Sequence, residues 1–451
     1  MIVVGAGPVG LTAALLLARR GHDVQVLERR TLPSELPRAV HLDAEAQRVL
    51  VDAGVDFAAL SSPGAGLRLL DADHRVLAEF PREPGAAGMF HQPDLEEQLR
   101  AALARAGGQL TTGVGVVAVR PVRGGAQVVT DRSGDPVLAA DLVLGCDGAG
   151  STVARAVRPR YRELARPDRW YVVDLLAPAP LPVWPGVHQV CDPVRAATFM
   201  PVVGLRYRAE FRVTDQPLDL PAELARFGAQ DCTVVREAEY EYGARVARRW
   251  RTGRVLLCGD AAHLTPPFIG QGLGLGLRDA HQLAWRVDAV LAGAHDALLD
   301  GFGRERAAHA RALVRLAAFT GWLMTAGGVR AARVRSGLAR LLPSTLLAAG
   351  TPPLRPGPWV RRPRVGRGHG VGRLVPDVRV RGRRLDDLLG PGWALLVCST
   401  EVPDLPELPG GARARVLHRG ALPDLGPALR DRWVLVRPDR VVAAVGPRAQ
   451  R

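Results

Sequence analysis

The sequence predicts an α/β fold, in which a parallel sheet of the nucleotide-binding type is interleaved with a mostly antiparallel sheet and followed by a small α/β unit. Three observations support this fold class. A strand, a glycine-rich turn, a helix and a second strand follow one another within residues 1–28. Residues 141–146 and 254–258 are apolar strands that each run into a glycine and an aspartate. Four β-like segments lie close together within residues 170–213, as in antiparallel sheets.

The first 28 residues match the dinucleotide-binding fingerprint. Gly5, Gly7 and Gly10 form G-x-G-x-x-G directly after an apolar strand, and a second strand ends at Glu28, 18 residues after the last glycine. We expect Gly5 to permit the tight turn, Gly7 to let the backbone approach a pyrophosphate, and Gly10 to let the helix pack closely on the strand. The helix N-terminus would face the phosphates, and Glu28 would accept hydrogen bonds from a ribose. A glycine-rich turn without a ligand is the structural alternative.

The remaining elements follow in chain order, and glycine, proline and aspartate mark many of their ends. The expected elements are helices at 43–52 and 95–106, a hairpin at 66–81, strands at 114–119, 126–130 and 141–146, a helix from residue 151, β-segments at 170–176, 187–191, 197–203 and 207–213, a strand at 254–258, a loop at 261–272, and helices at 275–291 and 297–320. Residues 350–372 are rich in proline, glycine and arginine and predict a linker. A small α/β unit is expected after this linker.

Composition and charge bear on whether the protein binds nucleic acid or a membrane surface. The 451 residues carry a net charge of +15 and a sequence pI of about 10.9, values that can indicate a nucleic-acid or membrane-surface partner. However, the sequence contains no lysine, no asparagine and only two isoleucines. We interpret the excess of arginine as the coding bias of a GC-rich genome. Because no basic stripe is interleaved with aromatic residues, no nucleic-acid partner is expected.

The cysteines and the apolar segments predict a reducing, cytoplasmic location. The five cysteines form no C-x-x-C motif and their number is odd, so neither a disulfide framework nor a metal site is expected. No apolar segment is long enough to span a bilayer. The chain begins directly in its first strand, so no targeting segment is expected.

Three separate strands end in an acid beside a glycine-containing turn. The acids are Glu28, Asp147 and Asp260. One such carboxylate could simply cap a turn. Three of them suit a ligand as extended as a flavin dinucleotide, which has an adenosine ribose, a pyrophosphate and a ribityl chain. FAD is therefore the expected cofactor.

With these motifs, the chain resembles the FAD-dependent aromatic hydroxylases of the para-hydroxybenzoate hydroxylase fold, and among them most the 3-(3-hydroxyphenyl)propionate/3-hydroxycinnamate hydroxylases. The segments that carry the resemblance are 3–10, 37–40, 43–46, 90–93, 147–149, 170–174, 191–195 and 254–280. The resemblance implies four parts, namely a Rossmann-like FAD-binding domain at 1–65, 92–165 and 249–325, a substrate-binding sheet domain at 66–91 and 166–248, a helix and linker at 326–372, and a thioredoxin-like C-terminal domain at 373–451.

The resemblance also assigns site residues by position. The residues implied to bind FAD are Gly5, Gly7, Gly10, Glu28, Arg29, Arg38, Gln92, Asp147, Gly148, Gly259, Asp260, Gly270 and Gly272. Catalytic roles are implied for His263 and for Pro267 and Gly274, which would lie along the flavin ring. Where the family usually has asparagine in G-Q-G-x-N, this chain has Gly274. A side-chain contact near the flavin is therefore expected to be absent.

Three of the polar candidates have structural alternatives. His263 would tune the flavin or deprotonate a phenol, or else form a hydrogen bond at a helix start. Arg195 would pair with a substrate carboxylate, or with Asp192 or Asp174. Tyr207 would contact the substrate, or occupy a half-buried position in the sheet.

The implied activity is hydroxylation of a phenolic, carboxylated aromatic compound of the 3-(3-hydroxyphenyl)propionate type. NADPH or NADH would reduce FAD, O₂ would then give a flavin hydroperoxide, and the phenol would attack its distal oxygen. One alternative is a polyketide-type hydroxylase on the same fold. Another, from a different class, is a non-catalytic, degenerate flavoprotein. The expected partners are the small phenolic substrate and a second copy of the chain in a homodimer, without a nucleic acid, membrane or metal.

Overall fold

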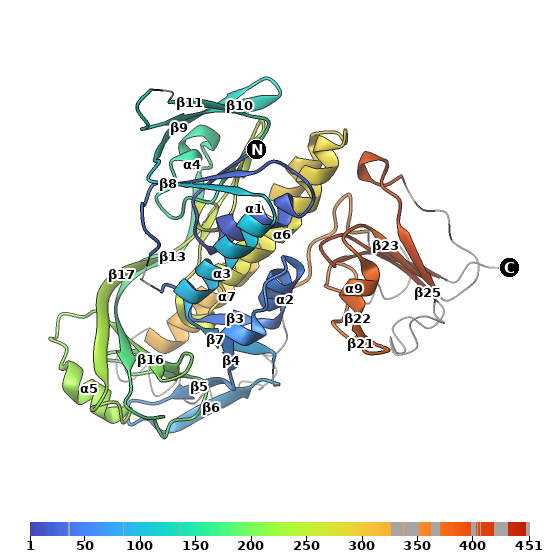
Figure 1. The fold of residues 1–451 in the computed structure, drawn as a ribbon. Coiled ribbons are helices and arrows are strands. Elements are labelled where there is room, and N and C mark those ends of the chain that lie inside the picture. Colours follow the sequence, from blue (N-terminus) through green and yellow to red (C-terminus); the bar gives the residue numbers. More distant parts are fainter. Residues whose placement is uncertain are drawn as a thin grey trace.

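The computed structural model of the chain has a large body and a smaller C-terminal unit packed beside it (Figure 1). The residues that the structure describes are 1–34, 37–83, 85–134, 136–325, 337, 351–361, 370–397, 403, 405, 407–418 and 432–447. Two large sheets, one parallel and one antiparallel, form the body together with the helices that pack on them.

The parallel sheet carries the glycine-rich turn. Its strand order is β18-β19-β12-β1-β2-β8, and every pair of neighbours is parallel except β18 and β19. Its strands are β1 (Ile2–Val4), β2 (Gln25–Glu28), β8 (Gln109–Thr112), β12 (Val143–Gly145), β18 (Arg251–Thr252) and β19 (Val255–Leu257). Because parallel strands point the same way, their carboxyl ends meet at one edge of the sheet. Glu28, Asp147 and Asp260 therefore gather at that edge.

Helices pack on this sheet and on one another. α1 (Pro8–Ala18) contacts both α3 (Gln92–Arg105) and α6 (Gly272–Leu291). The residues of α1 from Gly10 onward are all buried, which explains why this helix is apolar on every side. α4 (Val153–Val157) packs against β12 and β19. These contacts fix the N-terminus of α1 beside the carboxyl ends of the strands.

The second large sheet has eight strands in the order β20-β17-β13-β16-β15-β14-β5-β6, and only β14 and β5 pair in parallel. Its strands are β5 (Gly66–Leu70), β6 (Val76–Pro81), β13 (Tyr161–Leu176), β14 (Val187–Val190), β15 (Ala197–Pro201), β16 (Arg206–Arg212), β17 (Thr233–Ala247) and β20 (His263–Leu264). The predicted hairpin at 66–81 and the four β-segments of 170–213 are confirmed. The two longest strands, β13 and β17, extend from this sheet toward the parallel sheet (Figure 1).

Side chains alternate across the eight-stranded sheet. On β16, Tyr207 and Phe211 pack into an apolar cluster with Phe227, which follows α5 (Leu220–Arg226). Arg208, which follows Tyr207, and Glu210, which precedes Phe211, point to the opposite face and line a cavity. The sheet therefore has one face for the core and one face for a ligand.

Smaller elements complete the body. Two three-stranded sheets have the orders β3-β7-β4 and β11-β10-β9. Their strands, and the two remaining helices of the body, are β3 (His41–Asp43), β4 (Ser61–Pro63), β7 (Ala87–Phe90), β9 (Val116–Val122), β10 (Gly125–Thr130), β11 (Val137–Ala140), α2 (Ala44–Asp52) and α7 (Ala297–Thr325). The helix α7 contacts α6, β13 and β17 and so connects the two large sheets.

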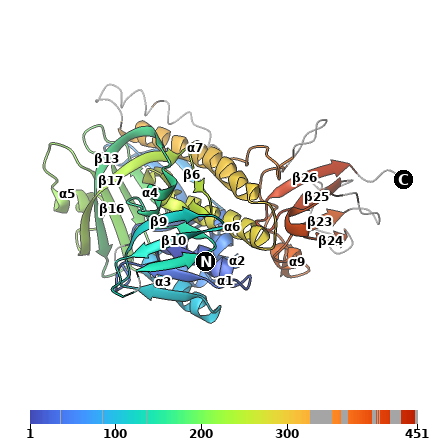
Figure 2. The ribbon, with the colours of Figure 1, turned by 90° about the horizontal axis from the view of Figure 1, so that it is seen from above.

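The C-terminal unit is a small mixed sheet with a short helix (Figure 2). Its strand order is β24-β23-β25-β26, with β23 and β24 parallel and the other pairs antiparallel. Its elements are β21 (Arg379–Val380), β22 (Arg383–Arg384), α9 (Leu385–Leu389), β23 (Ala394–Val397), β24 (Arg415–His418), β25 (Arg432–Val436) and β26 (Val442–Pro447). Cys398 and most of the predicted helix and linker at 326–372 lie outside the described residues. None of the helices in the described ranges combines the length and apolar character needed to cross a bilayer.

Candidate active site

The glycine-rich turn between β1 and α1 is tightly packed at two glycines and open at the third. Gly5 has a φ of +101°, and a Cβ there would lie 2.5 Å from the carbonyl oxygen of Cys146. A Cβ at Gly10 would lie 2.0 Å from the carbonyl oxygen of Gly5. At Gly7, no atom of the described residues lies within 4 Å of the Cβ position. The turn therefore holds α1 close to β1 and leaves space at a helix N-terminus that attracts phosphate.

Glu28 fixes this turn from the end of β2. Its Oε2 accepts a hydrogen bond from the backbone N–H of Ala6 at 2.8 Å, and its Oε1 accepts one from Arg30 at 3.0 Å. Glu28 and Arg29 both line the cavity that begins at the turn. Since a carboxylate has about four acceptor positions, Glu28 can hold the turn and still bind a ligand hydroxyl.

Asp147 builds the loop that follows β12. Its carboxylate accepts hydrogen bonds from Ser151 Oγ at 2.5 Å and from the backbone N–H groups of Thr152 and Val153 at 2.6 and 3.1 Å. Gly148 has a φ of +79°, which favours glycine at this turn. Asp147 and Gly148 line the cavity, but the Asp147 carboxylate is largely occupied by the start of α4.

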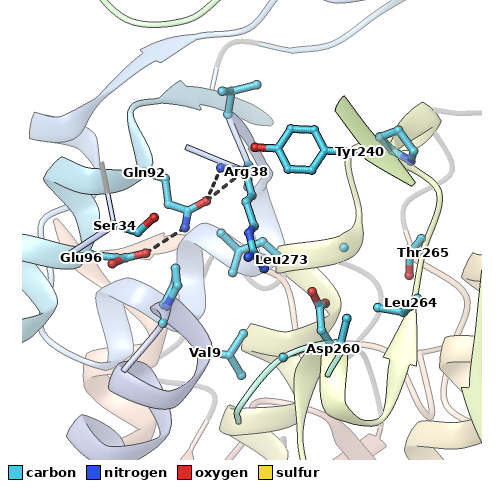
Figure 3. Close-up of a pocket in the computed structure, with 18 of the residues that line it drawn as sticks. Val9, Ser34, Arg38, Gln92, Glu96, Tyr240, Asp260, Leu264, Thr265 and Leu273 are labelled. Carbon is cyan, nitrogen blue, oxygen red and sulfur yellow. Dashed lines mark hydrogen bonds between the residues drawn. The ribbon is translucent and has the colours of Figure 1, made fainter. Parts of the chain in front are cut away.

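Asp260 follows β19, and its carboxylate points into the cavity near the Arg38 side chain (Figure 3). Burial raises the pKa of Asp260, and the nearby His263 and Arg38 oppose that rise. The neighbouring Gly259 has a φ of +62° and donates its N–H to Asp279 Oδ2 at 3.0 Å. Gly259 thus positions Asp260 without lining the cavity itself.

Gln92 acts on the cavity through a neighbouring loop. Its Oε1 accepts hydrogen bonds from the backbone N–H groups of Arg38 and Ala39 at 3.0 and 2.8 Å, and its Nε2 donates to Glu96 Oε1 at 2.8 Å. Both Gln92 and Arg38 line the cavity, and Figure 3 shows the Arg38 side chain extending into it. Gln92 therefore holds the backbone that directs Arg38 toward the ligand space.

The segment 267–272, just before and at the start of α6, forms another wall. Pro267, Gly270 and Gly272 all line the cavity. Gly270 has a φ of +61°, and a Cβ there would lie 2.7 Å from Nδ1 of His41. Only glycine therefore lets His41 pack against this segment. Burial lowers the pKa of His41, so its ring is neutral near pH 7.

Gly274 lies on α6 but is not part of the cavity lining. A Cβ at this position would lie 2.9 Å from Arg278 Nη1 and 3.4 Å from the Cβ of Ala46. Arg278 Nη2 donates to the two carboxylate oxygens of Asp43 at 2.7 and 2.6 Å. Position 274 therefore makes room for a buried ion pair, and this geometry does not support its predicted place along the flavin ring.

His263 is fully buried and does not line the cavity. Its Nε2 lies 2.7 Å from Asp279 Oδ2, and Asp279 Oδ1 accepts a hydrogen bond from Arg306 Nε at 2.6 Å. This triad joins β20, α6 and α7 inside the protein. A buried structural role therefore fits His263 better than direct contact with a phenol, but its partner Asp279 lies within α6 and not at a helix start.

Arg195 also lies away from the cavity lining. Its guanidinium donates to the backbone carbonyl oxygens of Arg212 at 3.0 Å, Gln216 at 2.5 Å and Pro217 at 3.1 Å. It therefore stabilises the loop that follows β16. The structure supports neither the predicted substrate carboxylate nor the predicted aspartates as its partner.

Tyr207 lies on the core face of β16. Its hydroxyl oxygen accepts a hydrogen bond from the Leu181 N–H at 2.9 Å, and its ring stacks on Phe199 with the centroids 5.9 Å apart. This placement does not support the predicted substrate contact, because alternate residues of a strand point to opposite faces and Tyr207 points to the core. The ligand face of β16 carries Arg208 and Glu210 instead.

The sequence did not reveal most of the substrate half of the cavity. The residues missed are His41, Val172, Gln189, Thr198, Met200, Arg208, Glu210, Tyr240 and Tyr242. Their shared signal is alternation, since those on β15 and β16 occupy every second position and the apolar residues between them, such as Phe199 and Ala209, fill the core. Choosing the correct face requires the three-dimensional arrangement.

A buried charge cluster lies on the ligand face of the sheet. Arg208 Nε donates to Asp174 Oδ1 at 2.7 Å, and Arg236 Nη1 donates to Asp174 Oδ2 at 2.8 Å. Arg208 also donates to the carbonyl oxygens of Arg38 at 3.0 Å and Pro37 at 2.6 Å. These bonds fix the loop that carries Arg38 to the sheet, so the two halves of the cavity are held together.

One cavity of about 830 Å³ joins the glycine-rich turn to this sheet face. A family model described as FAD binding domain matches residues 1–213 and 226–317, which are more than half of the chain. A 3-(3-hydroxy-phenyl)propionate/3-hydroxycinnamic acid hydroxylase of Mycobacterium sp. (strain KMS) is 35% identical over 360 residues. The chain belongs to the FAD-dependent aromatic hydroxylases. The match covers 75% of this chain and 62% of that relative, so the chain spans less than two thirds of the relative's length.

Other comparisons agree on this family and fold. A probable NADH-specific resorcinol 4-hydroxylase of Rhodococcus jostii (strain RHA1) is 32% identical over 356 residues, which are 72% of this chain and 65% of the relative. The crystal structure of aklavinone-11 hydroxylase in complex with FAD and aklavinone has a TM-score of 0.78 and 24% identity. That comparison covers 100% of this chain and 95% of the other, and it establishes the shared fold.

The cavity of this chain fits FAD. Open space at Gly7 lies beside the N-terminus of α1, where a pyrophosphate can bind. Carboxylates at Glu28 and Asp260 face the same cavity, so hydroxyl groups along an extended ligand have acceptors. In the described part of the chain, no group of histidine, cysteine, aspartate and glutamate side chains has the arrangement of a metal site.

Proposed function

We propose that this hydroxylase inserts one oxygen atom of O₂ into a phenolic aromatic substrate of the 3-(3-hydroxyphenyl)propionate type and consumes NADPH or NADH. The observation that carries the proposal is a continuous cavity that joins the dinucleotide turn to the ligand face of the eight-stranded sheet. A cavity with apolar walls and a few polar groups is typical of a small-molecule site. The 35% identity to a hydroxylase of this type supports the substrate class.

In this proposal the residues at the carboxyl ends of the parallel strands would hold FAD, which would supply the oxygen chemistry when bound. The turn at Gly7 would bind the pyrophosphate, Glu28 and Arg29 would bind the adenosine ribose, and Asp260 would bind the ribityl chain. The segment 267–272 would contact the flavin ring. The residues proposed to bind FAD or to build its site are Gly5, Gly7, Gly10, Glu28, Arg29, Arg38, Gln92, Asp147, Gly148, Gly259, Asp260, Gly270 and Gly272.

The C-terminal unit is proposed to be thioredoxin-like. The mixed strand order β24-β23-β25-β26, with one parallel pair, supports this reading. Its docking to α2 and α7 through Asp386 and Arg437 suits a structural role. A redox role is not proposed.

A polyketide-type aromatic hydroxylase is the second candidate. It is favoured by the position of Arg195, which binds backbone carbonyls and is not available to a substrate carboxylate. Arg208, the buried cation on the ligand face, is bound by Asp174 and two carbonyl oxygens. A larger phenol without a carboxylate would need no such cation.

A substrate panel tests the two candidates. Purified protein with FAD is supplied with NADH or NADPH and with 3-(3-hydroxyphenyl)propionate, resorcinol or a polycyclic phenol, and hydroxylated product is measured by mass spectrometry. Product from the phenylpropionate supports the first candidate, and product from the polycyclic phenol alone supports the second. If no phenol yields product, both candidates fail and the degenerate flavoprotein is favoured.

A further inference from the structure

We infer that Glu210 binds the substrate's phenolic hydroxyl and accepts its proton, a role that rests on the phenol hydroxylation proposed above. Glu210 lies near the centre of the eight-stranded sheet, on β16 between β13 and β15. It pairs in register with Val172 on one side and Thr198 on the other, and all three line the cavity. Its carboxylate therefore faces the substrate half of the cavity, where the eight-stranded sheet forms the wall.

The neighbours of Glu210 leave its carboxylate available. The closest cationic atom in the described residues is Arg208 Nη1, at 4.0 Å from Oε1, which is beyond hydrogen-bonding distance. Arg208 instead directs its donors to Asp174, Arg38 and Pro37. The second oxygen of Asp174 is bound by Arg236. Both oxygens of Asp174 are thus bound without Glu210, while Nε and Nη2 of Arg236 have no hydrogen-bond partner in the described residues.

A buried carboxylate that accepts no hydrogen bond raises the free energy of the folded protein. A ligand that donates a hydrogen bond to Glu210 would remove this cost. Glu210 is only 7% exposed. A phenolic O–H is such a donor, and the apolar side chains of Val172 and Met200 beside Glu210 suit an aromatic ring. Burial raises the pKa of Glu210, Arg208 opposes the rise, and Asp174 adds to it. The carboxylate is therefore a stronger base than an exposed one.

Other charged and titratable groups lie around Glu210 on its own strand and on the two strands β13 and β17. These are Arg208 on β16, Asp174 on β13, and Arg236 and Tyr242 on β17. The arginines stay charged at any practical pH. Burial raises the pKa of Tyr242 well above its ordinary value, and Glu210 adds to that rise, so Tyr242 stays neutral. His41 also lines the cavity and titrates on the acid side, so variants are needed to isolate Glu210.

The proton transfer involves only the substrate phenol and the Glu210 side chain. The phenolic O–H bond breaks, its electron pair stays on the phenol oxygen, and the proton forms an O–H bond with the Glu210 carboxylate. The ring becomes more electron-rich at the carbon that is hydroxylated. After oxygen transfer, the hydroxylated carbon loses its hydrogen as a proton, the electron pair of that C–H bond restores the aromatic ring, and the proton held by Glu210 returns to the phenol oxygen. No further oxidant or reductant is required.

The test compares wild type with Glu210→Gln and with a matched control, Glu239→Gln. Glu239 lies on β17 of the same sheet but is exposed and pairs with Arg169. Phenol binding is measured by the change in flavin absorbance between pH 6 and 9, and kcat/KM is measured for one phenol and its more acidic fluorinated analogues. FAD content and melting temperature are recorded for each protein.

We expect Glu210→Gln to keep FAD and to lower kcat/KM at least tenfold at pH 7, because proton transfer to a positioned base contributes about 10²–10⁴-fold. The difference in kcat/KM between Glu210→Gln and wild type should become smaller as the phenol becomes more acidic. In Glu210→Gln, kcat/KM should also decrease less at low pH than it does in wild type. Glu239→Gln should match wild type. If Glu210→Gln loses FAD, Glu210→Asp is tested instead, because it keeps a carboxylate. In Glu210→Asp, kcat/KM must still fall at low pH and must still depend only weakly on the acidity of the phenol, as in wild type.

Two results would overturn the inference in different ways. If wild type hydroxylates a phenol and Glu210→Gln shows the same kcat/KM, pH profile and dependence on phenol acidity, Glu210 has no such role and the proposed function stands. If wild type hydroxylates no phenol, the proposed function fails and the inference fails with it.

Discussion

At the scale of single residues, the direction of each side chain decides its role. Arg208 and Glu210 face the cavity, whereas Tyr207 between Arg206 and Arg208 faces the core. At the cofactor end, Asp260 points into the cavity while its neighbour Gly259 supports the turn. A shift of one position along a strand exchanges the two faces, so a ligand residue and a core residue can be adjacent in sequence.

Asp260→Asn should weaken FAD binding about 10- to 100-fold. The reason is that a hydrogen bond to a charged acceptor contributes about 1.5–3 kcal/mol, and the amide keeps the shape but loses the charge. The measurement is titration of the apoprotein with FAD, followed by flavin fluorescence. Asp231→Asn, at an exposed position, is the control. Equal FAD affinity in wild type and Asp260→Asn would mean that Asp260 only shapes the loop.

The sequence predicted the cofactor end better than the substrate end, for a physical reason. The glycine-rich turn needs particular residues at fixed spacing, because a Cβ at Gly5 or Gly10 would clash with backbone atoms. The substrate end is built from side chains that converge from strands far apart in the chain, such as Gln189 and Tyr242. His263 is another residue whose role the sequence could not predict, since its buried partner Asp279 could not be assigned from sequence spacing alone.

At the scale of elements, α2 and α6 are joined behind the segment 267–272. Asp43 caps α2 by accepting a hydrogen bond from the Ala46 N–H at 2.9 Å. The same carboxylate binds Arg278 of α6 and accepts a hydrogen bond from Gln271 Nε2 at 2.6 Å. Burial alone would raise the pKa of Asp43, but Arg278 outweighs burial and lowers it. The network therefore fixes the start of α6, next to the cavity.

Gly274→Asn should destabilise the protein by about 1–3 kcal/mol, the usual cost of overpacking a core. The added side chain would displace the Arg278 guanidinium, whose Nη1 lies 2.9 Å from the Cβ position. The free energy of unfolding in urea is measured for Gly274→Asn, Arg278→Met and the double variant. Because both changes disturb one ion pair, their effects should be less than additive. Strict additivity would show that position 274 does not act through Arg278.

At the scale of the whole molecule, buried ion pairs attach the C-terminal unit to the body. Arg437 Nη1 donates to Glu305 on α7 at 2.9 Å and also pairs with Asp439. Arg48 on α2 donates from Nε to Asp386 at 2.5 Å. All of these side chains are buried. If the C-terminal unit unfolded alone, Glu305 and Arg48 of the body would remain buried without their charged partners, which is unfavourable. We therefore expect the unit and the body to unfold together.

Stability should fall at low pH partly through this interface. Burial alone would raise the pKa of Asp439, but Arg437 outweighs burial and lowers it to about 2 from an ordinary value of 3.8. A lowered pKa in the folded state adds stability above pH 3.8, and this contribution is lost as the pH falls toward 2. The contribution is about 2 kcal/mol. Urea unfolding between pH 5 and 2.5 should show a shallower loss in Asp439→Asn than in wild type or in the control Asp377→Asn. Identical slopes would contradict this assignment.

The net positive charge should not create a nucleic-acid site. Several arginines lie inside the protein beside acids, among them Arg278, Arg286, Arg306 and Arg437. Binding to random duplex DNA should be weak and should collapse between about 50 and 200 mM salt, as expected for phosphate contacts alone. Fluorescence anisotropy with labelled duplexes checks this expectation. Tight, sequence-selective binding at 150 mM salt would contradict it.

The proposed function requires that FAD, held where the parallel strands end, would supply oxygen to a phenol held on the ligand face of the eight-stranded sheet. The most direct measurement supplies wild-type protein with FAD, NAD(P)H, ¹⁸O₂ and the phenol that most stimulates NAD(P)H oxidation. We expect a product heavier by one ¹⁸O atom, formed in proportion to NAD(P)H consumed. NAD(P)H oxidation that yields only hydrogen peroxide, or product that carries oxygen from water, would contradict the claim.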